Sequence, residues 1–283
     1  MKKIKYLLLI FVSVQCFSQI SGNVIDSKTG LPIDYVNIWV KNTRKGTTTN
    51  SKGNFNFENG KVGDTLLISY LGYKELQFIA KKENTVKLTP NEIDLAEVLI
   101  IPMRNTQIKT INSYNKSNSI KEFYYNGHYS LARFYKYKKE YEQIPFINKI
   151  SLVVLSALKN KVTFKIHLIK ADKEGKPSDQ ILSEYYIRTT DKGKNEITVD
   201  FSNEKLIFPK NGVFVVIDRL NLEENKFSNK LAKGILQPAI GMEKEDSEKN
   251  TWLGYGGKWI APKDLKKYAG SNKNIAINIE LTD

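Results

Sequence analysis

The 283-residue chain is poor in the side chains that most enzyme classes require, since it holds one cysteine, Cys16, and two histidines, His128 and His167. A single cysteine excludes an internal disulfide framework and a zinc site made of cysteines. The histidines lie too far apart in the sequence for the His-Glu-x-x-His pattern of zinc peptidases. The Gly-x-Ser-x-Gly motif of serine hydrolases and the glycine-rich phosphate-binding loop are also missing. We therefore predict no catalytic residue, no cofactor and no metal site.

Long apolar runs are lacking as well, except at the N-terminus. Lys2, Lys3 and Lys5 precede an apolar stretch over residues 6–14, and Cys16 and Ser18 place small residues before Gln19. This pattern predicts a signal peptide over residues 1–18, because the apolar run is shorter than the roughly 20 residues that span a bilayer.

Cleavage before Cys16, followed by lipidation, is the alternative. Gln15 precedes that cysteine, where a lipobox has a small residue, so we expect cleavage before Gln19 instead. The mature chain would then be exported across the inner membrane and would be periplasmic, outer-membrane-associated or extracellular, without cysteine and without a transmembrane segment.

Positive charge is concentrated in the second part of the chain. Residues 19–101 hold 10 Lys and Arg against 9 Asp and Glu, whereas residues 102–283 hold 31 against 21. The densest basic segment is 133–139, Arg-Phe-Tyr-Lys-Tyr-Lys-Lys. We expect a solvated basic surface there. An anionic partner such as lipopolysaccharide or an acidic glycan is the alternative, and a nucleic acid is not expected for an exported protein.

Residues 20–101 alternate short apolar segments with turn residues. The segments expected as strands are 22–26, 35–40, 55–57, 64–70, 76–79, 86–88 and 98–101. A polar stretch over residues 47–53 separates the second from the third, and no amphipathic helix interrupts the series. This pattern predicts a small β-sandwich, with Trp39 in its sheet.

The same segment resembles the carboxypeptidase-like regulatory domain, a transthyretin-like sandwich of secreted and outer-membrane proteins in Bacteroidetes-type bacteria. The resemblance rests on residues 20–26, 30–33, 46–55, 66–73 and 95–100. Asn50 replaces the acidic residue usual in the family, although an amide makes the same turn bond. Gly53 and Gly72 are expected at reversals that need positive φ. The resemblance implies an accessory module rather than an activity.

The rest of the chain predicts a linker over residues 102–128 and a second, jelly-roll-like sandwich over residues 129–283. Polar residues dominate the linker, with a short ordered piece expected near residues 120–125. Alternating apolar residues then recur over 150–154, 162–168, 212–217 and 275–281. Residues 221–274 are expected to form long irregular loops. The whole fold class is therefore all-β, with two sandwiches after a signal peptide.

The segment 252–259, Trp-Leu-Gly-Tyr-Gly-Gly-Lys-Trp, is the strongest candidate for a ligand surface. Its candidate residues are Trp252, Tyr255, Lys258 and Trp259. Aromatic rings next to glycines can offer flat faces to sugars or to a protein partner. A Gly-Gly hairpin with both tryptophans packed on the second sandwich is the competing interpretation.

Other polar residues favour structural roles. His167 is expected on the solvent-facing side of its strand, and His128 at the edge of the linker. Asp172, Glu174 and Asp179 surround Gly175 and Pro177. We expect these acids to be turn residues, with a calcium site as the less favoured alternative.

Two functions remain open at this stage. The first is a non-enzymatic secreted or envelope accessory protein that binds a glycan, lipopolysaccharide or an envelope protein. The second is an auxiliary domain or subunit of a peptidase or glycan-degrading enzyme. Residues 102–283 are too few for a receptor barrel of about 22 strands at roughly 10 residues per strand.

Overall fold

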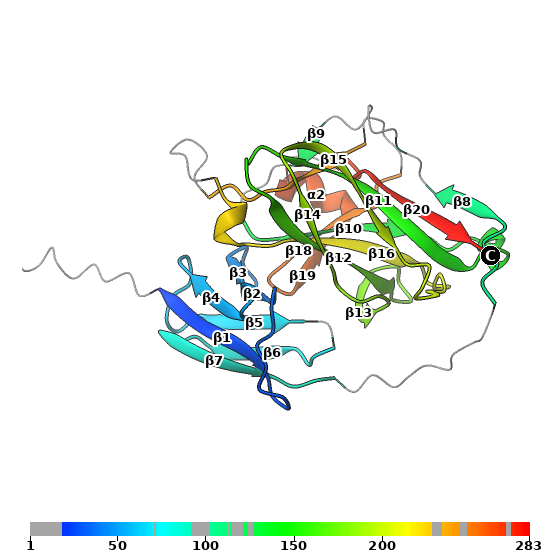
Figure 1. Ribbon diagram of the computed structural model, residues 1–283. Coiled ribbons are helices and arrows are strands. Elements are labelled where there is room, and N and C mark those ends of the chain that lie inside the picture. Colours follow the sequence, from blue (N-terminus) through cyan, green and yellow to red (C-terminus); the bar gives the residue numbers. More distant parts are fainter. Residues whose placement is uncertain are drawn as a thin grey trace, which may run out of the picture.

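The computed structural model describes residues 19–70, 72–91, 102–111, 114, 121–123, 127–227, 234–243, 248–269 and 273–283. The predicted signal peptide and the closing strand expected at 98–101 lie outside these residues. The described chain is all-β and forms two sandwiches that lie against each other (Figure 1). Within the described residues, no helix has both the length and the apolar character needed to cross a membrane.

The first sandwich contains two sheets. The three-stranded sheet has the order β4-β1-β7 and the four-stranded sheet the order β3-β2-β5-β6. Only β1 and β7 run parallel, and the other pairs of this sandwich are antiparallel. The strands are β1 (Ile20–Asp26), β2 (Asn37–Val40), β3 (Gly46–Thr48), β4 (Asn54–Phe57), β5 (Thr65–Ser69), β6 (Leu76–Ile79) and β7 (Glu83–Leu88). Alternating apolar residues of both sheets, such as Val24, Ile38 and Ile68, form its core.

Turn chemistry fixes the chain reversals that the sequence predicted. Gly53 and Gly72 have φ of 72° and 76°, the left-handed region in which glycine has no steric penalty. The Asn50 side-chain oxygen accepts the amides of Lys52 (2.9 Å) and Asn54 (3.1 Å), so this amide does make the expected turn bond.

The polar stretch 47–53 is not wholly a turn, because its first residues form β3 and are buried. The Thr47 hydroxyl donates to the carbonyl of Asn56 (2.9 Å), and the Thr49 hydroxyl donates to the carbonyl of Ile33 (3.0 Å). A hydroxyl that finds such a partner can be buried at little cost, so polar composition did not reveal this strand.

The second sandwich also has two sheets. The seven-stranded sheet has the order β13-β12-β16-β10-β18-β19, with β14 paired to β12. The six-stranded sheet has the order β8-β20-β11-β17-β9, with β15 paired to β11. The strands are β8 (Ile108–Ile111), β9 (Lys121–Phe123), β10 (Ser130–Tyr135), β11 (Phe146–Ser156), β12 (Val162–Ala171), β13 (Pro177–Ile181), β14 (Tyr186–Thr190), β15 (Gly193–Asp200), β16 (Val213–Arg219), β17 (Ala239–Met242), β18 (Thr251–Tyr255), β19 (Lys258–Ile260) and β20 (Ile277–Thr282).

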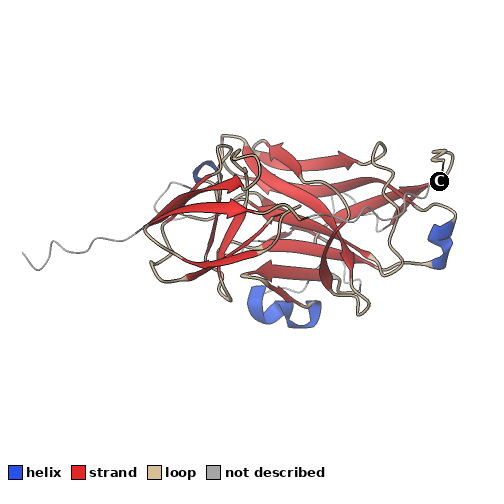
Figure 2. Cartoon of the chain, turned by 90° about the horizontal axis from the view of Figure 1, so that it is seen from below, coloured by secondary structure: helices blue, strands red, loops and turns tan. Residues whose placement is uncertain are grey.

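Many successive strands of the second sandwich alternate between its two sheets, as β10, β11 and β12 do. This alternation is typical of jelly-roll folds. The inward faces of both sheets make the largest apolar core of the molecule. Strands form its body, and the short helices lie at its periphery (Figure 2).

The linker prediction for residues 102–128 needs correction, because described parts of this segment are strands of the second sandwich. β8 pairs with β20, and β9 pairs with β17 near the short ordered piece that was expected. The Asp283 carboxylate accepts the amides of Thr106 (2.7 Å) and Gln107 (2.9 Å) and fixes the start of β8. Three of the four β8 residues are exposed, so the strand lacks the apolar alternation that would have announced it.

The prediction of irregular loops over residues 221–274 is also wrong in part. This segment contains β17, β18, β19, the 3-10 turn Glu223–Asn225 and the helix α2 (Pro262–Ala269). α2 begins at Pro262, carries Asp264 in its first turn and has two lysines in its last turn, an arrangement that the helix dipole favours. Leu265 is buried, whereas its neighbours on both sides (263–264 and 266–267) are exposed and charged. The sequence of this helix therefore shows no apolar stripe.

Arg133, predicted on a basic surface, lies instead between the two sheets of the second sandwich. Its side chain is 1% exposed, pairs with Glu243 and donates to the carbonyl of Ile275 (2.6 Å). Lys136, Lys138 and Lys139 of the same segment are exposed. Strand alternation explains why this arginine is buried while the lysines are exposed, because Arg133 points to the same face as the buried residues Leu131 and Tyr135.

Replacing Arg133 with methionine should lower the free energy of unfolding by about 3 kcal/mol, since it leaves the Ile275 carbonyl and the Glu243 carboxylate without this donor. The exposed Lys136→Met change in the same strand region should stay within about 0.5 kcal/mol. Urea unfolding of both variants checks this. If the Arg133 variant also lost no more than about 0.5 kcal/mol, the buried arginine would contribute no more to stability than an exposed lysine.

Candidate functional site

The predicted ligand segment forms the hairpin β18–β19. Its turn residues Gly256 and Gly257 have φ of 56° and 81°, as a two-residue hairpin turn of type I′ requires. The strand register pairs Gly254 with Trp259 and Tyr255 with Lys258. Residues directly opposite each other point to the same side of a sheet. Trp252 and Trp259 therefore share the outer face of the seven-stranded sheet, whereas Tyr255 and Lys258 share the other face.

The two tryptophans join an aromatic cluster on that outer face. Phe134, Trp252 and Trp259 are half-buried and pack over Ala132, Ile169, Ala171, Phe214 and Val216. The Trp252 and Phe214 rings meet edge to face at 5.8 Å, and the Phe134 and Phe214 rings lie 4.9 Å apart. We call Phe134, Trp252 and Trp259 the aromatic face. Each of these rings is supported from below and keeps part of its surface in contact with solvent.

Glycine at position 254 permits this arrangement. A Cβ added there would lie 2.8 Å from the Trp259 ring, which therefore rests directly on the backbone of β18. The ring thereby gains a fixed position on the sheet.

Tyr255 and Lys258 do not join the aromatic face. Tyr255 packs against the main core of the second sandwich, and the Arg44 guanidinium of the first sandwich lies 5.6 Å from the centre of its ring. The Lys258 side chain is exposed. The structure thus brings two of the four candidate residues together and places the other two on the opposite side of the hairpin.

The turn of this hairpin contacts the first sandwich. The Asn42 amide donates to the Gly256 carbonyl (3.0 Å). A Cβ at position 256 would lie 2.5 Å from the Thr43 carbonyl oxygen, and one at position 257 would lie 2.5 Å from the Leu67 side chain. Both glycines are therefore needed for close approach as well as for their positive φ.

Polar and apolar contacts extend this domain interface. Asn221 donates its backbone amide to the Thr48 hydroxyl (3.0 Å) and its side-chain amide to the Gly46 carbonyl (2.6 Å). Trp39 and Leu67 of the first sandwich belong to the same apolar cluster as Tyr129 and Leu131 of the second. Trp39 thus lies in the sheet where it was predicted but faces the other domain.

Both histidines are buried, His128 at this interface and His167 beside it, which corrects their predicted positions. His128 is 2% exposed, and its ring centre lies 4.1 Å from that of Trp39. His167 is 7% exposed, although it does lie on the outer face of β12 as expected. Strand alternation identifies the face of a residue but not the neighbouring domain that covers that face.

A buried charged pair, which sequence reasoning missed, lies beside His167. The Lys165 ammonium is 3.4 Å from the Asp218 carboxylate and donates to the Tyr35 carbonyl of the first sandwich (3.0 Å). The Ser130 hydroxyl donates to Asp218. Burial lowers the pKa of Lys165, whereas the Lys165 ammonium and the Ser130 hydroxyl hold the pKa of Asp218 below its usual value against the effect of burial. The available signal was an aspartate directly after the apolar run 213–217 and a lysine within the alternating segment 162–168.

This cluster contains a hydroxyl, a carboxylate and an amine, but the first sandwich covers it. The Ser130 side chain is buried, and the Lys165 ammonium lies 4.1 Å from the Tyr185 ring centre and 5.2 Å from that of Tyr70. An arrangement that is closed to substrate can hold two domains in register. It offers no open nucleophile.

Among the described residues, no three His, Cys, Asp or Glu side chains are placed to hold a metal ion. Asp172 accepts the amides of Glu174 and Lys176, both at 2.8 Å, as a turn residue does. The side chain of Asp179 lies outside the described residues.

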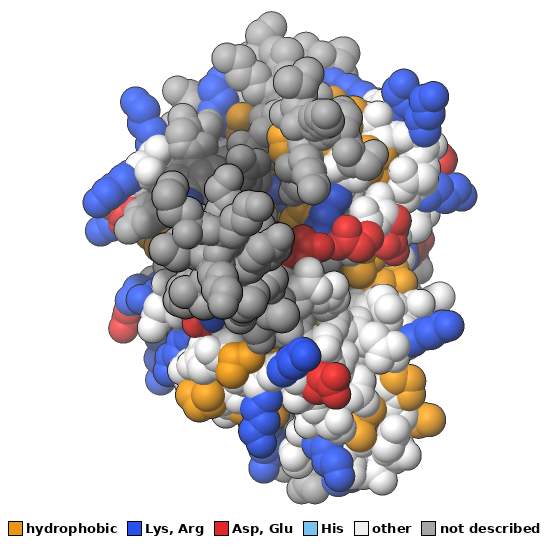
Figure 3. Space-filling view, turned by 90° about the vertical axis from the view of Figure 1, so that its left-hand side faces the viewer, with side chains coloured by type: hydrophobic (Ala, Val, Ile, Leu, Met, Phe, Trp, Pro, Cys, Tyr) orange, Lys and Arg blue, Asp and Glu red, His pale blue; other side chains and the backbone are white. Residues whose placement is uncertain are grey.

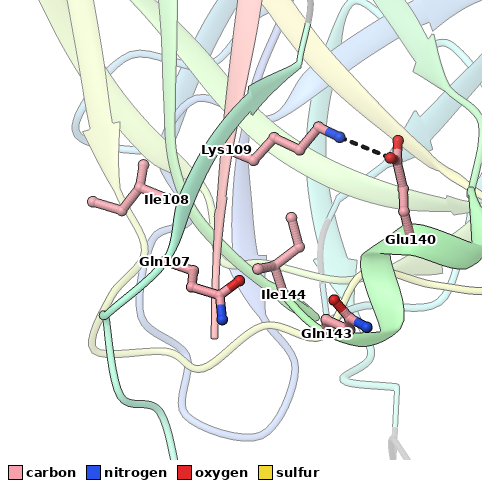
Figure 4. Close-up of a pocket in the computed structure, with 6 residues that line it drawn as sticks. All are labelled: Gln107, Ile108, Lys109, Glu140, Gln143 and Ile144. Carbon is pink, nitrogen blue, oxygen red and sulfur yellow. Dashed lines mark ion pairs between the residues drawn. The ribbon is translucent and has the colours of Figure 1, made fainter.

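A pocket of about 210 Å³ lies between β8 and the 3-10 turn Lys139–Glu142. It is lined by Gln107, Ile108, Lys109, Glu140, Gln143 and Ile144 (Figure 4). The Lys109–Glu140 pair beside it (2.8 Å) is half in solvent, so it contributes little to stability or specificity.

Positive side chains do not form one patch on the face shown in Figure 3. Lysines and arginines (blue) are scattered around the described surface, with acidic groups among them. The excess charge of residues 102–283 thus gives a general attraction for anions rather than a shaped site on this face.

Comparison with known proteins confirms the resemblance of the first sandwich. Residues 20–100 match the model of the CarboxypepD_reg-like domain family. The chain is 30% identical over 106 residues to TonB-dependent receptor P3 of Formosa agariphila, covering 36% of this chain and 11% of the relative. It is 36% identical over 96 residues to TonB-dependent receptor SusC of Bacteroides thetaiotaomicron, covering 32% and 9%. The matched part spans about a tenth of the length of these curated relatives.

Two solved structures align with the chain at low scores. A crystal structure of the T13 IBDV viral particle aligns with 93% of this chain and 58% of its own, at 11% identity and a TM-score of 0.24. A structure of the Gx strain of infectious bursal disease virus aligns at 10% identity with a TM-score of 0.25, covering 93% and 60%. Scores this low establish no shared fold.

Replacing Gly256 with alanine should lower the free energy of unfolding by about 2–4 kcal/mol, because the new methyl group would clash with Thr43 in addition to straining φ. Gly234→Ala is the matched control, since Gly234 has φ of 81° with no atom within 4 Å of the added Cβ. It should cost about 1 kcal/mol from backbone strain alone. Thermal and urea unfolding provide the comparison, and similar losses in both variants would show that the domain contact at Gly256 is loose.

Proposed function

We propose that this protein is a non-enzymatic accessory protein of the cell envelope, in which the second sandwich binds a glycan or an envelope protein. A domain shared with TonB-dependent receptors supports the envelope location. The observation that carries the binding proposal is the aromatic face, because three half-buried rings stand together on the outside of a rigid sheet.

The aromatic face suits a flat, partly apolar ligand. Phe214 and Ala132 beneath it are fully buried, so the rings above are already held in place before a ligand arrives. Binding then loses little side-chain entropy. Tryptophan contributes a large apolar surface that can stack on a sugar ring or receive an anchor residue of a protein.

Electrostatic attraction is a separate contribution. The positive excess of residues 102–283 favours encounter with anionic envelope components, lipopolysaccharide included. Such attraction weakens as salt shortens the Debye length, whereas stacking on the aromatic face does not depend on charge. Salt dependence therefore distinguishes the two modes of binding.

The alternative, an auxiliary unit of a peptidase or glycan-degrading enzyme, has less support. The hydroxyl, amine and carboxylate that do cluster, those of Ser130, Lys165 and Asp218, are covered by the first sandwich. Turnover of a peptide or glycan substrate that is lost on replacing a single carboxylate would overturn the non-enzymatic proposal.

The test is a binding screen of residues 19–283 against polysaccharides, lipopolysaccharide and envelope extracts at about 0.05 M and 0.5 M salt. We expect saturable binding that persists at high salt and that Trp259→Ala weakens at least tenfold. Trp252→Ala should weaken it similarly, because both rings belong to the same face.

Ile79→Ala is the matched control, since Ile79 is an exposed apolar residue of the first sandwich, 59% exposed. It should leave binding unchanged. Melting temperatures of the tryptophan variants should fall by only a few degrees, consistent with about 1 kcal/mol for a half-buried ring. A fall of ten degrees or more would assign the tryptophans to the core, and binding that high salt abolishes would leave only non-specific attraction.

A further inference from the structure

We propose that the interface between the two sandwiches is a latch that mild acid releases, with the His128 and His167 imidazoles as the groups that take up protons. The inference does not depend on what the aromatic face binds. Both histidines of the chain are buried: His128 lies against Trp39 of the first sandwich, and His167 lies two residues from Lys165, which donates to the Tyr35 carbonyl of that sandwich.

His128 is enclosed by residues of the first sandwich. Its ring stacks against Trp39, and the backbone of Gly46 is so close that a Cβ there would lie 2.3 Å from the ring. Neither ring nitrogen has a partner of hydrogen-bond geometry among the described residues. The nearby Arg219 backbone raises the pKa of His128, but by less than burial lowers it. The site therefore fits a neutral ring and offers little to a charged one.

His167 has a carboxylate near it but no hydrogen bond to that group. Its Nδ1 atom lies 3.8 Å from Asp218 Oδ2, and no described group satisfies this nitrogen. The Asp218 carboxylate is already engaged by Ser130 and Lys165. The Tyr185 ring covers the imidazole edge to face at 4.8 Å.

The buried charged groups around both rings already include more cations than anions. β12 contributes Lys165, and β16 contributes Asp218 and Arg219, whose guanidinium donates to the Tyr129 hydroxyl and the Leu236 carbonyl. From the first sandwich, the half-buried Asp34 acts on Lys165 from a greater distance. Protonation of either imidazole would thus add a cation to a buried region with a single fully buried carboxylate, Asp218.

The direction of the pH effect follows from these surroundings. Burial lowers the pKa of His128 to about 3 and that of His167 to about 4, with nearby cations adding to the effect. An imidazole freed from the interface returns to about 6.5. Between these values the undocked state binds more protons than the docked state, so docking is strongest above pH 6.5 and weakens as the pH falls toward 4.

Protonation favours release of the first sandwich, because this sandwich encloses His128 directly and its Tyr70 ring packs on Tyr185, which covers His167. When Trp39 and Gly46 withdraw, His128 becomes hydrated, and the Lys165 ammonium exchanges the Tyr35 carbonyl for water. Each sandwich retains its own core, so separation does not require either to unfold.

The experiment is hydrogen exchange on the protein at pH 7.5 and 5.5, corrected for intrinsic exchange rates. The reporters are the amides of Asn42 and Asn221, which donate across the interface. Docking should weaken about tenfold for each histidine over this interval, or about a hundredfold for both. Amides in β5 and β11 should stay protected and show that both sandwiches remain folded.

The double variant His128→Phe, His167→Phe keeps the ring packing but cannot take up protons. Protection of the Asn42 and Asn221 amides should then be the same at both pH values. An acid response equal to that of the unmodified protein would overturn the proposal, as would undiminished protection of these amides in the unmodified protein at pH 5.5.

If the double variant fails to fold, NMR titration of the two imidazoles in the unmodified protein decides. Ordinary titration near pH 6.5 while the interface amides stay protected would also overturn the proposal. Depressed titration of both rings together with loss of amide protection supports it.

Discussion

The arrangement of this molecule depends on a charged pair, Lys165 and Asp218, placed on the outer face of a β-sheet and then covered. Burying the pair costs desolvation that its mutual attraction barely offsets. The contact with the first sandwich is stabilised by apolar packing, since Trp39 and Leu67 join the main apolar core of the second sandwich. The pair itself contributes orientation, because the Lys165 ammonium reaches the Tyr35 carbonyl in only one register of the two sandwiches. Hydrophobic burial holds the domains together, and the polar cluster selects how they meet.

That outer face is divided into two parts with different physical roles. One part carries Lys165, His167 and Asp218 and is covered by the first sandwich; the other carries the aromatic face, which remains half open. The β18–β19 hairpin contributes to both, because Gly256 contacts the first sandwich while Trp259 packs into the aromatic cluster. A single continuous sheet thus supports an internal contact and a candidate external one, and the strands between them keep their separation constant.

Local sequence patterns predicted where the strands lie, but they did not predict which residues cover each face of a strand. Alternation and turn glycines located most strands of the first sandwich, and the two-residue Gly256–Gly257 turn fixes which side chains of the hairpin share a face. Alternation also placed His167 on the outer face of β12, yet the burial of that face comes from another domain more than a hundred residues away in sequence. Arg133 was missed for a related reason, since its partners Glu243 and Ile275 belong to distant segments. What a face contacts is a long-range property that strand periodicity does not contain.

The aromatic face and the domain contact of this sheet are separable in energetic terms. The aromatic face rests on Ala132, Phe214 and Val216, which belong to β10 and β16 of the second sandwich and would remain in place without the first. The domain contact relies instead on Trp39, on the buried polar cluster and on the Gly256 turn. Weakening that contact removes one anchor of the hairpin but leaves the pairing of β18 with β10 intact. The proposed ligand binding on the aromatic face and the docking of the first sandwich therefore share a scaffold without sharing the interactions that sustain them.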